Sequence, residues 1–233
     1  MVNNTEQLFT LDNGIVLHNI RNMDGGGSTH YKDFLSIVKR KGKSHYSKAL
    51  EWCAGPGFIG YALLGNKVCD HLVLMDKYEP AIISCNETAL ANNLNEQVTT
   101  YVVDAVGKLP KTEKFDLVLG NPPHMWDSNQ FIKNIEDDWA ERGHVLKQEN
   151  VDTLERLLLD HKQLIHIEFF KNISKYLLPG ADLFISEPGN SRQMHEIVGY
   201  AISNGLLFVG EEPMPTMQVN VPNATLLHFR FEE

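Results

Sequence analysis

The chain has 233 residues, 42% hydrophobic and 22% charged, which suits one globular α/β domain with a small appendage. No stretch approaches the roughly 18 consecutive apolar residues of a membrane span, and the first residues lack a secretory signal, so we expect a cytoplasmic protein without membrane contact. The net charge of −9 argues against a nucleic-acid binder, which usually carries a basic face, without forbidding a local basic patch.

Residues 1–47 are expected to form a polar lead followed by one helix. The lead contains the glycine-rich segment 25–30, whose three glycines permit close backbone approach but also suit a linker. The helix should bury one apolar face made of Phe34, Leu35, Ile37 and Val38. Its basic end is either solvated or a contact surface for an acidic substrate, and it consists of Lys39, Arg40, Lys41 and Lys43.

From residue 48 onward, strand patterns alternate with helix patterns. The expected strands are 48–53, 71–75, 98–103, 115–119, 181–186, 206–210 and 224–231. The expected helices follow the turn at 55–60 and cover 78–93, 124–160, 161–178 (ending at Pro179-Gly180) and 190–204. This alternation predicts an α/β domain over 48–233, with a seven-stranded, mostly parallel sheet and helices on both faces. The last two strands have no helix between them, so one strand near the C-terminus should run antiparallel.

A glycine turn, Gly55-Pro56-Gly57-Phe58-Ile59-Gly60, joins the first of these strands to its helix. Glycines let a ligand approach the backbone, and the helix start offers free N–H groups. Asp76 ends the next strand, where a carboxylate can accept both hydroxyl hydrogens of a ribose. Glu51 would repel a pyrophosphate but suits a cationic amino group, and Asp104 can accept from an adenine amine. Each acid alone is as well explained as a solvated strand-end residue.

The tetrapeptide Asn121-Pro122-Pro123-His124 follows the fourth strand. Its prolines stiffen the backbone and leave the Pro122 carbonyl without a local N–H partner. The Asn121 amide oxygen and that carbonyl can therefore accept two hydrogen bonds from one substrate nitrogen. His124 can stack on a planar substrate group. A plain strand-ending turn explains the tetrapeptide as well.

Taken together, these motifs resemble class I S-adenosylmethionine-dependent methyltransferases, which have a Rossmann-like fold, over roughly residues 48–187. Asn-Pro-Pro-His resembles the amino-methyltransferase branch, which includes release-factor glutamine, adenine-N6 and rRNA guanine-N2 methyltransferases. The resemblance implies that Glu51, Gly55 and Gly57 line the methionine portion, Asp76 holds the ribose and Asp104 the adenine amine. The cofactor-binding set would be completed by Cys53, Ala54, Lys77, Ala105 and Asn121. The resemblance further implies that the substrate nitrogen is held by Asn121 and Pro122, with His124 stacking on its planar group.

The sequence departs from this family at three points. Cys53 stands where the first glycine of the turn is usual, and His124 stands where Tyr or Phe is usual. Only about 45 residues precede the first strand, so we expect no counterpart of the extra domain of the release-factor enzymes. The proposed chemistry is direct displacement at the sulfonium methyl, driven by alignment and by hydrogen bonds that stabilise charge growing on the nitrogen, with no metal. His124 can alternatively serve as a general base.

Other candidates have simpler explanations. His161 and His166, near Glu168, are five residues apart rather than four, so we interpret them as surface or core histidines, not metal ligands. The insert 124–160, with Trp126, Trp139 and His144, is expected to cover the substrate, and segment 25–30 either closes over the cofactor or is a linker. Glu187-Pro188-Gly189-Asn190 is interpreted as a turn and helix cap, with a substrate contact from Glu187 as the alternative. The cysteines Cys53, Cys69 and Cys85 form no zinc or disulfide pattern and are expected to be small buried residues.

Four functions therefore compete. The first is methylation of a planar amide or amino nitrogen on a protein side chain or small molecule. The second is nucleobase methylation, which a basic groove beside Asn121 built from Lys39 to Lys43 would favour. The third is a non-catalytic scaffold subunit, which would not need Asn121 and Asp76. The fourth is a nicotinamide dehydrogenase, which lacks a hydride-relay constellation here. The acceptor's identity and the oligomeric state are left open.

Overall fold

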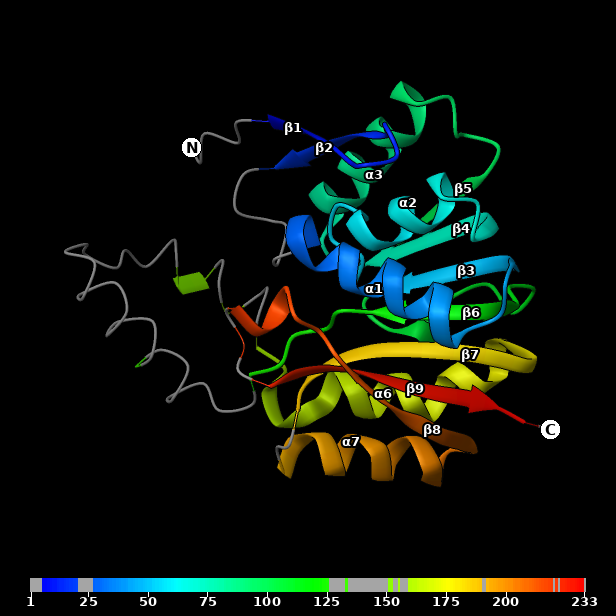
Figure 1. Ribbon diagram of the computed structural model, residues 1–233, viewed down its shortest axis with the longest axis vertical. Helices are drawn as coiled ribbons and strands as arrows, with labels where there is room; N and C mark the ends of the chain where they lie inside the picture. Colours follow the sequence, from blue (N-terminus) through cyan, green and yellow to red (C-terminus); the bar gives the residue numbers. More distant parts are fainter. Residues whose placement is uncertain are drawn as a thin grey trace.

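The computed structural model describes residues 6–20, 27–125, 133, 151–152, 155, 159–189, 192–219, 221 and 223–232. These residues form one seven-stranded sheet with helices on both faces and a separate two-stranded hairpin (Figure 1). No helix in these ranges is both long enough and apolar enough to cross a membrane.

The sheet has the strand order β5-β4-β3-β6-β7-β9-β8. Its strands are β3 (Tyr46–Trp52), β4 (Cys69–Asp76), β5 (Val98–Val102), β6 (Phe115–Gly120), β7 (Leu177–Pro188), β8 (Leu206–Pro213) and β9 (Ala224–Phe231). The first five pair in parallel, while β9 pairs antiparallel with both β7 and β8. The predicted fold class, with one antiparallel strand near the C-terminus, is confirmed.

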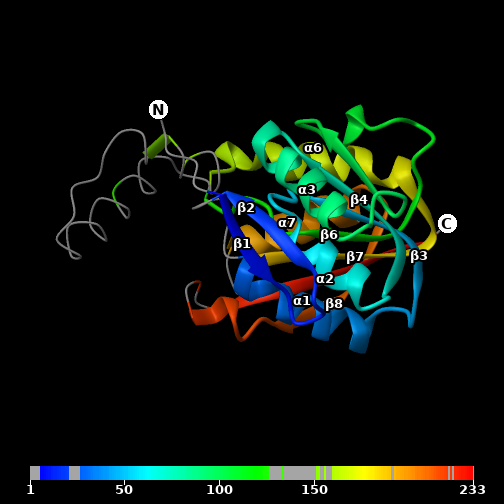
Figure 2. The ribbon, with the colours of Figure 1, turned by 90° about the horizontal axis from the view of Figure 1, so that it is seen from above.

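The helices cover the sheet in two layers. The longer helices are α1 (Gly27–Lys41), α2 (Phe58–Gly65), α3 (Glu79–Ala91), α6 (Leu164–Ile173) and α7 (Arg192–Ser203). Short 3-10 turns are η1 (Val106–Lys108), η2 (His161–Gln163), η3 (Ser174–Tyr176) and η4 (Met217–Val219). Helices α1 and α6 lie on opposite sides of the sheet (Figure 2), and each side has its own apolar core.

Side-chain alternation along the strands supplies both cores, because successive strand residues point to opposite faces. The core under α1 and α2 takes Ala49, Leu72 and Leu117, and the core under α6 and α7 takes their successors Leu50, Val73 and Val118. Strands buried on both faces read as continuous apolar runs, which is why the sequence predicted these strands well.

A hairpin that the sequence analysis did not predict precedes α1. It consists of β1 (Glu6–Thr10) and β2 (Val16–Ile20), paired antiparallel, and β2 packs against α3. The polar lead therefore contains two strands. Asn13 and Gly14 in the connecting turn were a usable signal, because Asn-Gly between apolar residues favours a hairpin.

Strand β7 is longer than predicted at both ends. Pro179 and Gly180 do not end a helix as predicted, because helix α6 stops at Ile173 and a 3-10 turn leads into the strand. At the other end, Glu187 is paired with Thr225 of β9 and is therefore a strand residue rather than part of a turn. Most of the predicted insert 124–160, including Trp126, Trp139 and His144, lies outside the described residues, as do Gly25, Gly26 and Asn190.

Candidate active site

A pocket of about 380 Å³ opens at the carboxyl ends of β3, β4 and β6. The chain extends outward from β3 to β4 and β5, then returns to β6 on the other side, so the pocket lies at the switch point where α/β sheets bind ligands. Eight of the predicted residues line it: Glu51, Cys53, Ala54, Gly55, Asp76, Lys77, Asp104 and Asn121. Further lining residues are Gly27, Trp52, Phe58, Ile59, Met75, Tyr78, Ala81, Val103, Pro123 and Ile165. Four predicted residues, Gly57, Ala105, Pro122 and His124, do not line it.

The turn after β3 depends on three residues in the left-handed backbone region. Cys53 has φ +54°, Gly55 has φ +51° and Gly57 has φ +82°. A cysteine is unusual there, because its Cβ crowds the following carbonyl, at a cost of about 1–2 kcal/mol. Cys53 thus takes the backbone conformation of the glycine it replaces. Gly57 does not line the pocket but turns the chain into α2, whose N-cap it is.

Asp76 is fixed by backbone donors at the pocket wall. One carboxylate oxygen accepts from the Gly55 N–H at 2.9 Å, and the other accepts from the Tyr78 N–H at 2.8 Å. Burial raises the pKa of Asp76, opposed by these hydrogen bonds. Each oxygen keeps a further lone pair, so the side chain can accept the two hydroxyl hydrogens predicted for a ribose.

Glu51 lies under the glycine turn and is only 2% exposed. One of its carboxylate oxygens accepts from the Gly60 N–H at 2.7 Å, in the first turn of α2. Burial raises its pKa to about 8, with the backbone hydrogen bonds opposing the rise. Glu51 therefore stabilises the glycine turn through this hydrogen bond and also places an acid in the pocket wall.

Asp104 lies at the opposite, open end of the pocket. Its side chain is more than half exposed and is paired with Lys108 at 2.6 Å, and the hydrogen bond with Lys108 lowers its pKa. Ala105, its neighbour, starts the turn to η1 and does not line the pocket. Near this end, Met75 and Val103 give apolar walls that suit a flat base.

These walls fit a nucleoside that carries a cationic amino acid. The volume is within the usual range for ligand pockets, roughly 300–1,000 Å³. A hydroxyl-accepting carboxylate at Asp76 lies between a buried acid at Glu51 and an apolar slot near Val103. No described basic side chain offsets the acid at Glu51, which would disfavour a pyrophosphate and favour an ammonium group.

The Asn-Pro-Pro-His element leaves β6 at the edge of this pocket. The Asn121 side-chain oxygen accepts from the Ser186 hydroxyl at 2.6 Å and lies 3.3 Å from His124 Nε2. No described residue donates to the Pro122 carbonyl. The His124 main-chain carbonyl accepts from the Gln193 side chain at 2.7 Å, which holds the tetrapeptide to α7.

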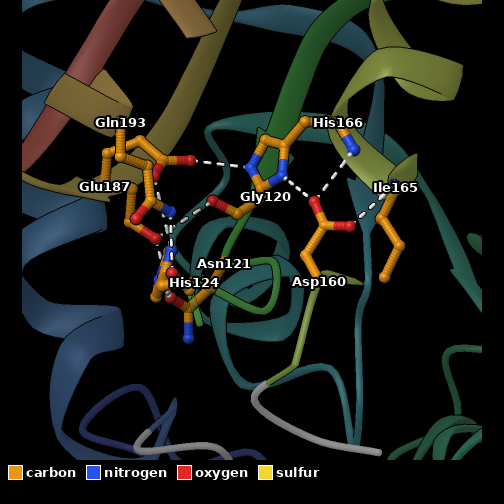
Figure 3. A network of polar contacts seen from close by, with 9 residues as sticks. Gly120, Asn121, His124, Asp160, Ile165, His166, Glu187 and Gln193 are labelled. Atoms are coloured by element: carbon orange, nitrogen blue, oxygen red, sulfur yellow. Dashed lines mark hydrogen bonds and ion pairs between the residues drawn. The ribbon is translucent and has the colours of Figure 1, made fainter. Parts of the chain in front are cut away.

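Behind this element lies a buried polar chain that the sequence analysis missed (Figure 3). His166, fully buried on α6, is bonded through Nδ1 to Asp160 at 2.6 Å and through Nε2 to Glu187 at 2.7 Å. The other Glu187 oxygen faces His124 Nδ1 at 3.5 Å. His166 is thus the core histidine of the two predicted alternatives, whereas His161 is exposed. Glu168 caps the backbone N–H groups of Val106 and Gly107.

The basic group at the end of α1 lies outside the pocket lining. Arg40 and Lys41 pair with Glu212, and Lys39 donates to Asn66. Lys43 lies over the ring of Tyr46, the first residue of β3. None of these four side chains lines the pocket. They do not form the groove beside Asn121 that nucleobase methylation would have favoured.

Comparison with known proteins places this geometry in a family. The model of the methyltransferase small domain family matches residues 32–149, just over half of the chain. A comparison with curated protein sequences finds no significant match.

Solved structures with the same fold include several methyltransferases. The N-methyltransferase NodS from Bradyrhizobium japonicum WM9 has a TM-score of 0.52 at 16% identity, over 87% of this chain and 94% of its own. A methyltransferase from Pyrococcus furiosus has a TM-score of 0.60 at 12% identity, over 88% and 85%. The ribosomal protein L11 methylase from Lactobacillus delbrueckii subsp. bulgaricus has a TM-score of 0.56 at 12% identity, over 88% and 79%. At these identities the likeness is one of fold. From the family match, the chain belongs to the methyltransferase small domain family and is an S-adenosylmethionine-dependent methyltransferase.

Proposed function

We propose that this enzyme methylates a planar amide or amino nitrogen on a protein side chain or a small molecule. The observation that carries the proposal is the position of Asn121, which lines the pocket at the carboxyl ends of β3, β4 and β6. Ser186 donates to its amide oxygen at 2.6 Å and so fixes which way the amide points. One lone pair of that oxygen faces the His124 ring in the free protein. A substrate N–H can replace the His124 ring as the group that faces this lone pair of the Asn121 oxygen.

Two acceptors then fix the direction of the substrate nitrogen. The Pro122 carbonyl has no donor among the described residues and follows Asn121 directly. When the substrate nitrogen donates both of its N–H bonds to these oxygens, its orientation is fixed and only its lone pair is left to attack the methyl group. When bound, S-adenosylmethionine supplies an electrophilic methyl carbon on a sulfonium. Oxygen acceptors at the nitrogen also stabilise the positive charge that develops there, so they act in the transition state.

A protein side chain or small molecule is favoured over a nucleic acid by charge. The basic residues of α1 do not line the pocket, two of them pair with Glu212, and the chain carries a net charge of −9. Among the described pocket residues, Lys77 is the single basic side chain. Binding to nucleic acid rests largely on phosphate neutralisation, which this surface does not offer in the described ranges.

The test is methyl transfer from S-adenosylmethionine carrying a tritiated methyl group. Three acceptor sets are compared: glutamine- and asparagine-containing peptides, small amides and aryl amines, and single-stranded adenine- and guanine-containing oligonucleotides. We expect label in the first or second set, with the methyl on nitrogen by mass spectrometry. Label in oligonucleotides alone would favour the nucleobase enzyme, and a methyl on oxygen or sulfur would refute the nitrogen target.

Asn121→Ala separates chemistry from cofactor binding. We expect turnover to fall about 10²–10³-fold, the usual effect of losing one transition-state hydrogen bond, with unchanged affinity for S-adenosylhomocysteine. Asn66→Ala is the matched control, because Asn66 caps α2 away from the pocket. Full turnover by Asn121→Ala would remove this residue from the mechanism.

A further inference from the structure

The Asn121 amide oxygen is already in contact with a donor from its own tetrapeptide. His124 Nε2 lies 3.3 Å from this oxygen, and the Ser186 hydroxyl donates to it at 2.6 Å. Because an amide oxygen can only accept, Nε2 carries a hydrogen in this contact. The His124 ring therefore presents an N–H donor beside the acceptor assigned to the substrate nitrogen.

The ring points at this place with its edge rather than its face. A residue that stacks on a planar group turns its face toward that group, whereas His124 turns Nε2 toward Asn121. The His124 main-chain carbonyl accepts from the Gln193 side chain at 2.7 Å, which fixes the backbone that carries the ring. This orientation suits a hydrogen-bond donor better than a stacking surface.

The other edge of the ring faces a carboxylate. His124 Nδ1 and Glu187 Oε2 are 3.5 Å apart, both are buried, and neither has a hydrogen-bond partner within the described ranges. Buried polar atoms are nearly always satisfied. A lone pair on Nδ1 would face the negative oxygen, so a hydrogen on Nδ1 is favoured, and a small movement of the ring closes the gap. Glu187 thus attracts one edge of the ring, offsets its positive charge and keeps Nε2 turned toward Asn121.

Glu187 is itself fixed from behind. Its other oxygen lies 2.7 Å from Nε2 of His166, whose Nδ1 lies 2.6 Å from Asp160 (Figure 3). With a carboxylate at each nitrogen, the His166 ring is an imidazolium. Burial opposes the charge on Glu187, but His166 and His124 outweigh it and lower the Glu187 pKa to about 2. The edge of the His166 ring packs against Trp52, a pocket-lining residue, so this row of charges lies directly behind the pocket wall.

Asn121 and His124 together offer an acceptor and a donor side by side. Their Oδ1 and Nε2 atoms are 3.3 Å apart. A primary carboxamide has the complementary pair, an N–H and a C=O joined through one carbon, with nitrogen and oxygen about 2.3 Å apart. Placed edge to edge, the carboxamide can give that N–H to Asn121 and accept from Nε2, each at about 3 Å. Its second N–H remains for the Pro122 carbonyl.

On the basis of the nitrogen-methylating function proposed above, we propose that His124 is a specificity-determining residue whose Nε2–H binds the carbonyl oxygen of a primary carboxamide, and that Glu187 is a positioning residue for its ring. The substrate class is thereby narrowed from planar nitrogens in general to carboxamides. Each polar atom of the carboxamide then has a partner: Asn121 and Pro122 accept its two N–H bonds, and His124 donates to its oxygen.

The selection follows from counting hydrogen bonds. In the free protein the Nε2–H is bound to Asn121, and a substrate nitrogen breaks that contact when it takes the same oxygen. A carboxamide replaces the lost partner of Nε2 with its own oxygen, whereas an aryl amine has no acceptor there and leaves the N–H unsatisfied. An unsatisfied buried donor costs binding free energy. Carboxamides should therefore bind more tightly than aryl amines, and part of that preference should reside in His124.

Two substitutions separate donation from stacking. His124→Phe keeps a flat ring but has no N–H, whereas His124→Gln keeps an N–H donor but has no ring. The probes are benzamide and aniline, both planar, and their affinities are measured by calorimetry with S-adenosylhomocysteine bound. His71→Phe is the matched control, because His71 is exposed on β4 and does not line the pocket.

We expect the wild type and His71→Phe to prefer benzamide. In His124→Phe the ratio of the two affinities should fall about 3- to 10-fold, the net effect of one hydrogen bond, and His124→Gln should recover most of it. With a carboxamide acceptor, His124→Phe should raise KM by the same factor and change kcat less. A stacking role predicts the reverse order of the two variants, because Phe stacks and Gln does not.

Nitrogen-15 NMR of histidine-labelled protein examines the donor without any ligand. The signals lost in His124→Phe identify the ring. We expect Nε2 of His124 to carry a hydrogen, and we expect its signal to shift in Asn121→Ala, which removes the acceptor.

A bare Nε2 in the wild type, no binding of benzamide, or an affinity ratio that His124→Phe leaves unchanged would overturn the proposal. Failure of the proposed function is distinguishable, because the wild type would then methylate no nitrogen of any acceptor. The affinity ratio and the Nε2 signal still decide the role of His124 in that case, since neither requires turnover.

Discussion

At the scale of single residues, Glu51 and Cys53 occupy positions with unusual requirements: a buried acid at Glu51 and a left-handed backbone at Cys53. Glu51 was predicted to suit a cationic amino group because of its charge. In the structure it is also buried against the backbone of α2. Cys53 stands where the first glycine of the turn is usual in the family that the sequence resembles. Its φ of +54° shows that the position does require a glycine-like conformation, which no residue type but glycine signals in a sequence.

We expect the burial of Glu51 to make cofactor affinity depend on pH. Because its pKa is raised to about 8, the free protein holds a neutral carboxyl below that pH, whereas a bound ammonium group favours the carboxylate. Binding of S-adenosylhomocysteine should therefore release a proton, and affinity should rise by up to about tenfold per pH unit between pH 6 and 8. Calorimetry in buffers of different ionisation enthalpy measures the release. Glu51→Gln should remove this slope, and an undiminished slope in that variant would contradict the assignment.

At the scale of elements, β7 and α6 show where sequence patterns stop being informative. The strand 181–186 was predicted from its apolar run, but its continuation through Glu187 and Pro188 resembles a turn. Pairing with β9 extends the strand, and the buried His166 on α6 offsets the charge of Glu187. Both are tertiary effects between segments distant in the chain, so local propensity cannot reveal them.

The buried pair of His166 and Glu187 should make the free energy of unfolding depend on pH. His166 has a folded pKa raised from 6.5 to about 9, so its contribution is complete below pH 6.5 and is lost as the pH rises to 9. Glu187 has a folded pKa lowered from 4.5 to about 2, so its contribution is complete above pH 4.5 and is lost as the pH falls to 2. The free energy of unfolding lost in Glu187→Gln should therefore be largest between pH 4.5 and 6.5, at about 3 kcal/mol.

Urea denaturation across this range provides the measurement. Glu51 is present in both proteins, so its own pH dependence cancels in the difference. The difference in the free energy of unfolding between the wild type and Glu187→Gln should become smaller on both the acid and the alkaline side of its maximum. A difference that stays constant with pH would show that the pair is not ionised as described.

At the scale of the whole molecule, the sheet order explains why widely spaced motifs form one site. Strands β4 and β6 flank β3, so the glycine turn, Asp76 and Asn121 end at a common edge. The sequence predicted this convergence, because parallel strands place their carboxyl ends together. It did not predict the hairpin on α3, the polar chain behind Trp52 or the contribution of Ile165, since each depends on contacts across the fold.

The most direct measurement is calorimetric binding of S-adenosylhomocysteine, compared with NAD, to the wild type, Asp76→Ala and Asn121→Ala. The wild type should bind S-adenosylhomocysteine and not NAD. Asp76→Ala should lose at least about tenfold in affinity, because hydrogen bonds to a charged group contribute roughly 1.5–3 kcal/mol, while Asn121→Ala should bind as the wild type does. Preference for NAD, or undiminished binding by Asp76→Ala, would contradict a cofactor site at the ends of these strands.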